Sequence, residues 1–71
     1  MQKKIALKQF RIGLDMSQAE FAAALGITRT HYSAIETGRL KGTAEFWKTL
    51  KTTFGLAETK LWELMNNEKA G

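Results

Sequence analysis

Apolar residues recur three and four positions apart along most of the chain, and no stretch alternates between apolar and polar positions as a half-buried strand would. Proline is absent and the glycines are scattered. The pattern predicts an all-α protein, a compact bundle of five short helices. The first is expected from about Gln2 to Leu14, with apolar surface at Ile5, Leu7, Phe10 and Leu14.

The next segment carries clear helix start and stop signals. Ser17 followed by Glu20 is a capping box, in which each side chain bonds the backbone N–H of the other residue. Gly26 ends that helix, because glycine readily adopts the left-handed conformation. Thr28 can cap a third helix only two residues later. The two helices must therefore be joined by a tight turn, which is the spacing of a helix-turn-helix.

Similar signals define the remaining helices. Thr43 caps a fourth helix that closes at Gly55, and a fifth is expected from about Glu58 to Asn66. We assign residues 1–66 to one domain and expect residues 67–71 to form a frayed tail.

The third helix has two different faces. Tyr32 and Ile35 lie three residues apart and are expected to face the core. The opposite face holds an arginine and small residues, which suits the major groove of duplex DNA. We expect base contacts from Arg29, Thr30, Ser33 and Ala34. For Ala34, contact with a thymine methyl and a plain helix-filling role both stay open.

The net charge of +4 is unevenly distributed. The chain has 7 basic and 3 acidic residues up to Lys41, and 4 of each after it. A positive field favours phosphate, because neutralising nucleic-acid phosphates releases condensed counterions. Gly38 ends the third helix, so Arg39 and Lys41 in the following loop could reach a phosphate.

Several function classes find no support in the composition. There is no cysteine and a single histidine, so neither a disulfide nor a metal site is expected. We expect no cofactor and no enzyme activity, because no nucleophile elbow and no phosphate-binding glycine loop is present. No segment resembles a signal peptide or a membrane span, so we expect a cytoplasmic protein, either bacterial or in the nucleoid of a phage-infected host. His31 is left with two interpretations, phosphate contact or simple exposure to solvent.

The last helix has more apolar surface than one small core can bury. Trp47 in the fourth helix is expected to be core, whereas Trp62 is less clearly so. The surplus indicates a subunit interface, and the candidates for it are Leu61, Trp62, Leu64 and Met65. We therefore expect a homodimer, at least on DNA.

Three segments in order carry a resemblance to a known family. They are Ser17-Gln18-Ala19-Glu20-Phe21-Ala22, then Leu25-Gly26-Ile27-Thr28, then Ile35-Glu36-Thr37-Gly38-Arg39. The pattern resembles the Cro/repressor-type (XRE-type) helix-turn-helix family of bacterial and phage-like transcriptional regulators. That resemblance implies the lambda-repressor-like fold and assigns base contacts to the outer face of the third helix. It also implies phosphate contacts from Ser17 and Gln18, and from Thr37 near the end of the third helix.

The same resemblance places Arg11 and Glu36 together as an ion pair that braces the first helix against the end of the third. The chain departs from the family pattern at two informative positions. Asp15 stands where the family usually has a glycine after the first helix, and Tyr32 replaces a smaller aliphatic residue. Asp tolerates the left-handed conformation better than most residues.

Together these patterns predict a sequence-specific regulator that binds double-stranded DNA, namely a repressor that binds a palindromic operator as a dimer. An antitoxin-type or other protein-interaction module, with DNA binding as a second role and a toxin or other protein as partner, stays open as an alternative.

Overall fold

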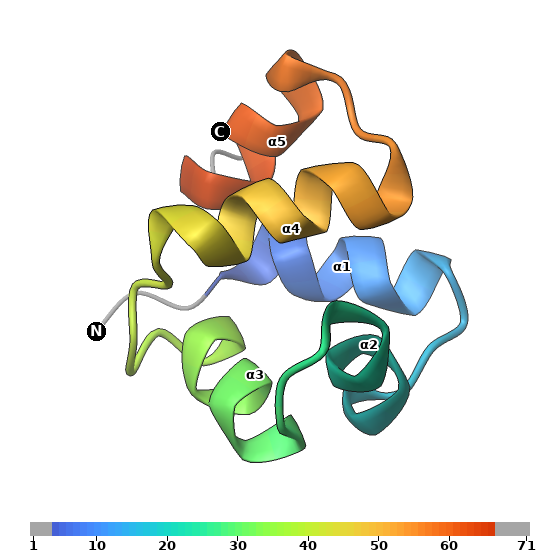
Figure 1. The fold of residues 1–71 in the computed structure, drawn as a ribbon, viewed down its shortest axis with the longest axis vertical. Helices are drawn as coiled ribbons and strands as arrows, with labels where there is room; N and C mark the ends of the chain where they lie inside the picture. The colour runs from blue at the N-terminus through green and yellow to red at the C-terminus, as the bar shows by residue number, and fades with distance from the viewer. Residues whose placement is uncertain (1–3, 67–71) are drawn as a thin grey trace.

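The computed structural model describes residues 4–66, and within them all the regular structure is helical. The helices are α1 (Ile5–Gly13), α2 (Gln18–Leu25), α3 (Arg29–Glu36), α4 (Ala44–Phe54) and α5 (Glu58–Asn66). In Figure 1, α1 and α4 cross the middle of the molecule, α2 and α3 lie together below them, and α5 lies above. The predicted all-α bundle of five short helices is confirmed.

The predicted starts of α2, α3 and α4 are confirmed by their caps. The Ser17 hydroxyl accepts a hydrogen bond from the backbone N–H of Glu20 at 3.0 Å, and the Glu20 carboxylate accepts one from the Ser17 N–H at 2.8 Å. Thr28 caps α3 and Thr43 caps α4 in the same way, through a side-chain oxygen. Each cap satisfies a donor that the first helical turn leaves free.

Left-handed residues make the turns. Gly26 ends α2 at φ 77°, and the next N–H, from Ile27, donates to the Ala22 carbonyl at 3.0 Å. This closure leaves room for only Gly26 to Thr28 between α2 and α3. Asp15 adopts φ 61°, and it is the only residue other than glycine with positive φ in the described part of the chain. The aspartate therefore takes the conformation for which a glycine is usually needed.

The start of α1 differs from the sequence-based expectation. The helix begins at Ile5 rather than near Gln2, because Lys4 lies outside it with φ −91° and ψ 73°. The Lys4 N–H donates to the Glu36 carbonyl at the end of α3, at 2.9 Å. Two of the four side chains predicted to form the apolar surface of this helix, Ile5 and Leu14, are 51% and 42% exposed, so the core does not cover them fully. The predicted tail, residues 67–71, lies outside the described residues.

The core is centred on aromatic rings between the helices. Phe21 of α2 stacks on Phe54 of α4, with ring centroids 4.9 Å apart, and lies 5.0 Å from the ring of Tyr32. Tyr32 and Ile35 of α3 are fully buried, as predicted, and Trp47 is core at 5% exposure. Packing of this kind fixes α3 on its inner side and leaves its outer side free.

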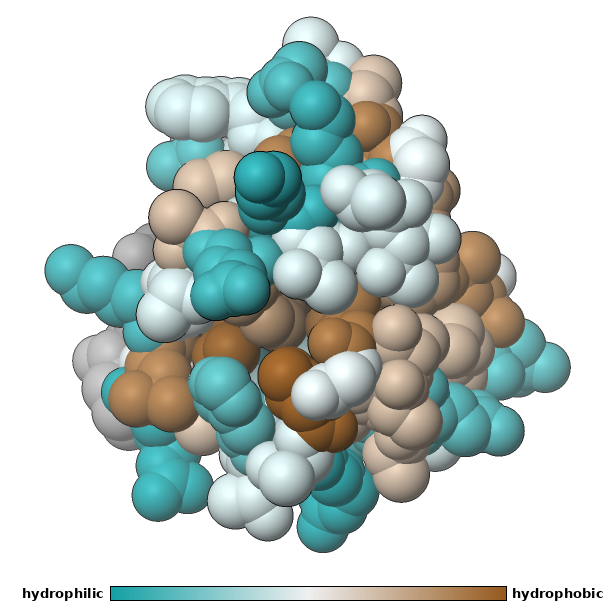
Figure 2. Space-filling view, in the orientation of Figure 1, coloured by the Kyte–Doolittle hydropathy of each residue, from teal (hydrophilic) through white to brown (hydrophobic). Residues whose placement is uncertain are grey.

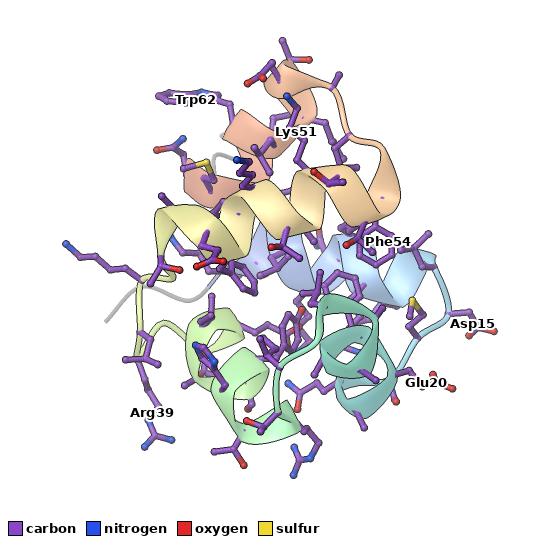
Figure 3. The ribbon with its side chains drawn as sticks, in the orientation of Figure 1. Asp15, Glu20, Arg39, Lys51, Phe54 and Trp62 are labelled. Carbon is purple, nitrogen blue, oxygen red and sulfur yellow. The ribbon has the colours of Figure 1, made fainter. Side chains whose placement is uncertain are left out.

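The apolar surface of α5 is divided between the core and the solvent. Leu64 is 1% exposed, and Leu61 and Met65 pack against the core from half-buried positions. Leu64 therefore offers no surface to a second subunit, because the monomer itself buries it. Trp62 is 62% exposed and lies at the opposite end of the molecule from α3 (Figure 3).

Candidate nucleic-acid interface

One face of α3 is buried against the other helices, and the opposite face is at least partly exposed to solvent. Tyr32, Ile35 and Glu36 are buried against the other helices. Arg29 and Thr30 in the first turn are exposed, and Ser33 and Ala34 one turn later are half-buried. The predicted base-contacting residues thus follow one another along one side of a helix whose other side is fixed. Rigid support of this kind holds contacting side chains in register.

The exposed Arg29 is held by a neighbour on α2. Its guanidinium donates from Nη1 to the Gln18 side-chain oxygen at 3.1 Å. The amide nitrogen of Gln18 donates in turn to the Glu36 carboxylate at 2.8 Å. A carboxylate only accepts hydrogen bonds, so the amide must turn its nitrogen toward Glu36 and its oxygen toward Arg29. The structure therefore gives Gln18 a role within the protein that the sequence did not indicate.

Glu36 is the centre of a buried polar cluster. The Arg11 guanidinium donates to its two carboxylate oxygens from Nε at 2.9 Å and from Nη2 at 3.3 Å. The Tyr32 hydroxyl donates to Oε2 at 2.5 Å. Arg11 also donates to the Met16 carbonyl at 2.8 Å. The pair joins α1 to the end of α3, with side-chain exposures of 11% for Arg11 and 4% for Glu36.

The protonation states of this cluster follow from its contacts. Burial alone would raise the pKa of Glu36, but hydrogen bonds from Arg11, Tyr32 and Gln18 outweigh it and hold that pKa below its ordinary value. The hydrogen bond to Glu36 raises the pKa of Arg11. Burial, with the adjacent carboxylate, raises the pKa of Tyr32. At neutral pH the cluster therefore holds one carboxylate, one guanidinium and one neutral phenol.

The first turn of α2 has the properties of an anion site. The capping box uses the N–H groups of Ser17 and Glu20. The N–H groups of Gln18 and Ala19, the first two helical residues, have no helical acceptor and lie at the positive end of the helix dipole. A phosphate placed there would accept from both.

The loop between α3 and α4 carries two further cations. The N–H groups of Arg39 and Leu40 both donate to the Ala34 carbonyl, at 2.8 and 3.0 Å, which anchors the loop to α3. Arg39 and Lys41 are exposed. In Figure 3 the Arg39 side chain extends away from α4, at the same end of the molecule as α3.

Thr37 and His31 lie at the two borders of this surface. The Thr37 hydroxyl donates to the Ser33 carbonyl at 2.8 Å, so a bond from it to a phosphate requires the hydroxyl to turn. His31 is exposed and lines a hollow between the α2–α3 turn and α4, together with Ile27, Glu45 and Phe46. Figure 2 shows brown apolar surface along this hollow. His31 therefore lies on the side of α3 that faces α4.

Two further observations concern residues 4–66 as a whole. They contain no group of three side chains suited to hold a metal ion. None of their helices has both the length and the apolar character needed to cross a bilayer.

Comparison with known families decides what this arrangement is. A family model described as helix-turn-helix matches residues 7–56, which run from within α1 into the turn between α4 and α5. The chain belongs to the helix-turn-helix family. This helix-turn-helix protein is a DNA-binding regulator of the XRE type. Neither a curated protein nor a solved structure matches the chain.

Proposed function

We propose that this helix-turn-helix protein is a transcriptional repressor that binds a palindromic operator as a homodimer, with α3 in the major groove. The observation that carries the proposal is the exposed face of α3, which bears Arg29 and Thr30 in its first turn. Residues at the start of such a helix lie closest to base edges. In this arrangement Arg29 pairs with a guanine, and Thr30, Ser33 and Ala34 contact neighbouring bases.

The phosphate contacts surround this helix. One phosphate lies at the first turn of α2, bound by the Ser17 hydroxyl and the Gln18 N–H, and a second lies near Arg39 and Lys41. Thr37 and His31 contact the backbone on the two sides of α3. Such contacts position the protein on the duplex, whereas the α3 side chains select the sequence.

The proposed dimer interface consists of apolar surface that remains exposed in the monomer. Trp62 is 62% exposed, and half-buried Met65 lines a hollow with Leu40, which is 48% exposed. One small module also offers a duplex limited contact area, so two copies bind more tightly than one. Repression then follows from occupancy of the operator, and the concentration of the protein sets that occupancy.

Selection of bound sites from a random duplex library at a stated salt concentration tests the proposal. We expect an inverted repeat whose half-sites have centres about 34 Å apart, one helical turn of DNA. A Trp62→Ser variant should bind as a monomer, keep the half-site preference and lose affinity. A single unrepeated half-site bound with one-to-one stoichiometry would contradict the dimer, and equal recovery of all sequences would contradict specific recognition.

A further inference from the structure

The outward side of α1 carries two apolar side chains that neither the core nor the proposed DNA contacts explain. Ile5 and Ile12 are 51% and 55% exposed. They are seven residues apart, close to two helical turns, so they lie on the same side of α1. Single exposed apolar residues are common on protein surfaces, whereas exposed apolar residues gathered on one face mark binding surfaces when they form a continuous patch.

Both isoleucines line one hollow, of about 650 Å³, between α1, the first turn of α2 and the end of α3. Lys8 lies between them in the sequence and lines the same hollow. Gln18 at the start of α2 and Thr37 just after the end of α3 also line it. The hollow therefore combines apolar side chains on α1 with two polar residues, Gln18 and Thr37, that the proposed function assigns to phosphate contacts.

The charge of this hollow is positive. Its one carboxylate, Glu36, is already compensated by Arg11 and two further hydrogen-bond donors. The Lys4 ammonium donates to the Met65 carbonyl at 2.8 Å. Within residues 4–66, the Lys8 ammonium has no hydrogen-bond or ion-pair partner among side chains or backbone. An occupant of the hollow would thus meet an uncompensated cation beside two exposed isoleucines.

We propose that this hollow is the docking site for an acidic amphipathic helix of a partner protein. Apolar residues on one face of that helix cover Ile5 and Ile12, and a carboxylate beside them pairs with Lys8. DNA fits the observations less well, because a hydrated phosphate can pair with Lys8 but cannot cover two hydrocarbon side chains.

The position of the site gives the partner a regulatory effect. Gln18 and Thr37 border both this hollow and the proposed phosphate contacts, so the partner helix and the DNA backbone would compete for the same space. Docking itself follows from Ile5, Ile12 and Lys8 alone, whereas the competition rests on the proposed function. The partner would act by removing the regulator from its operator.

Selection from a displayed library of helical peptides, about three to four turns long, tests the proposal with the full chain as target. We expect binders with apolar residues at spacings of three and four, flanked by Asp and Glu. Their affinity should fall about tenfold or more in Ile5→Ser, Ile12→Ser and Lys8→Glu. Matched controls are Leu14→Ser and Lys48→Glu, which make similar changes at exposed positions outside the hollow and should leave the affinity unchanged. Circular dichroism checks that every variant folds.

Four outcomes would overturn the docking site. They are the absence of any binder, binders without acidic residues, binders insensitive to both isoleucine variants, and equal losses in the controls. It would also be overturned if Ile5→Ser and Ile12→Ser lowered the mass of the free protein in ultracentrifugation, because a second copy would then cover the face. A uniform loss of affinity for all duplexes in Ile12→Ser, with peptide binding intact, would assign the face to DNA.

Competition is measured separately by adding the selected operator duplex to the peptide complex. Displacement of the peptide supports both the docking site and its regulatory effect. Simultaneous binding of peptide and duplex would leave the docking site in place and would overturn the proposed phosphate contacts of Gln18 and Thr37. Failure of the docking site and failure of the proposed function are therefore distinguishable.

Discussion

The buried Arg11–Glu36 pair allows a sharp test, because removal of each partner leaves different groups without hydrogen bonds. Breaking a buried ion pair costs about 3–5 kcal/mol of unfolding free energy, mainly through the stranded charge. We expect the cost of Arg11→Met to lie near the lower end of this range, because Tyr32 and Gln18 still donate hydrogen bonds to the remaining carboxylate. Glu36→Leu strands the guanidinium and also the buried Tyr32 hydroxyl, which adds about 1–3 kcal/mol.

These costs are large for a small domain, whose total stability is roughly 4–10 kcal/mol at this chain length. The double variant Arg11→Met/Glu36→Leu strands no charge, so it should be more stable than Glu36→Leu alone. Its remaining cost is the Tyr32 hydroxyl, about 1–3 kcal/mol. Adding Tyr32→Phe should remove that cost as well, which brings the triple variant close to the natural protein. This recovery is the distinctive expectation.

Urea unfolding followed by far-UV circular dichroism at neutral pH measures each variant. The control is the surface pair of Lys51 and Glu58, whose side chains are 37% and 80% exposed. Its single variants should each cost less than about 1 kcal/mol. Additive effects below about 0.5 kcal/mol at Arg11 and Glu36 would show that the pair is not buried in solution. A triple variant as unstable as Glu36→Leu would refute the role given to Tyr32.

Three further predictions concern DNA binding, the pH dependence of stability and the glycine before α4. Arg29→Ala should lose about 1–3 kcal/mol of binding on the preferred operator and relax preference at one base pair, whereas Lys41→Ala should weaken all duplexes equally and flatten the salt dependence by about one unit. Quantitative binding over a salt series checks both, and a uniform loss for Arg29→Ala would make it a phosphate contact. Because its pKa is lower in the folded than in the unfolded chain, Glu36 binds its proton more weakly when folded. The stability that ionised Glu36 contributes should be fully present above its ordinary pKa of 4.5 and should be lost as the pH falls through its pKa in the folded protein. The melting temperature, measured over an acid pH series, should therefore fall more steeply in the natural protein than in Glu36→Gln, and equal falls in the two proteins would contradict this. Gly42→Ala should destabilise by at least about 1–2 kcal/mol in thermal unfolding, because φ is +87° and the added Cβ would lie 2.9 Å from a buried indole nitrogen. Gly13→Ala, in open space within a helix, is the control and should stabilise slightly.

Features set by neighbouring residues could be predicted from the sequence. The starts of α2, α3 and α4 follow from Ser17, Thr28 and Thr43, because a cap depends on residues only three positions apart. The end of α2 at Gly26 is local in the same sense. The open face of α3 follows from helical periodicity once Tyr32 is placed in the core.

Features set by distant contacts could not be predicted in this way. The start of α1 depends on the bond from the Lys4 N–H to the Glu36 carbonyl, which lies more than thirty residues along the chain. The burial of Leu64 depends on how α5 packs, since periodicity alone did not separate its inner and outer apolar residues. The bonds of Gln18 to Glu36 and Arg29 join the start of α2 to both ends of α3, and no sequence spacing indicates them.

The fixed amide of Gln18 has a consequence for redesign of operator preference. Because Glu36 holds the amide nitrogen, position 18 offers only an acceptor to position 29. An arginine there is complemented, whereas a glutamate would face an oxygen that repels it. An engineer who wishes to retarget α3 to another base pair must therefore vary positions 18 and 29 as a unit. Libraries that randomise α3 alone would discard solutions that a change on α2 makes possible.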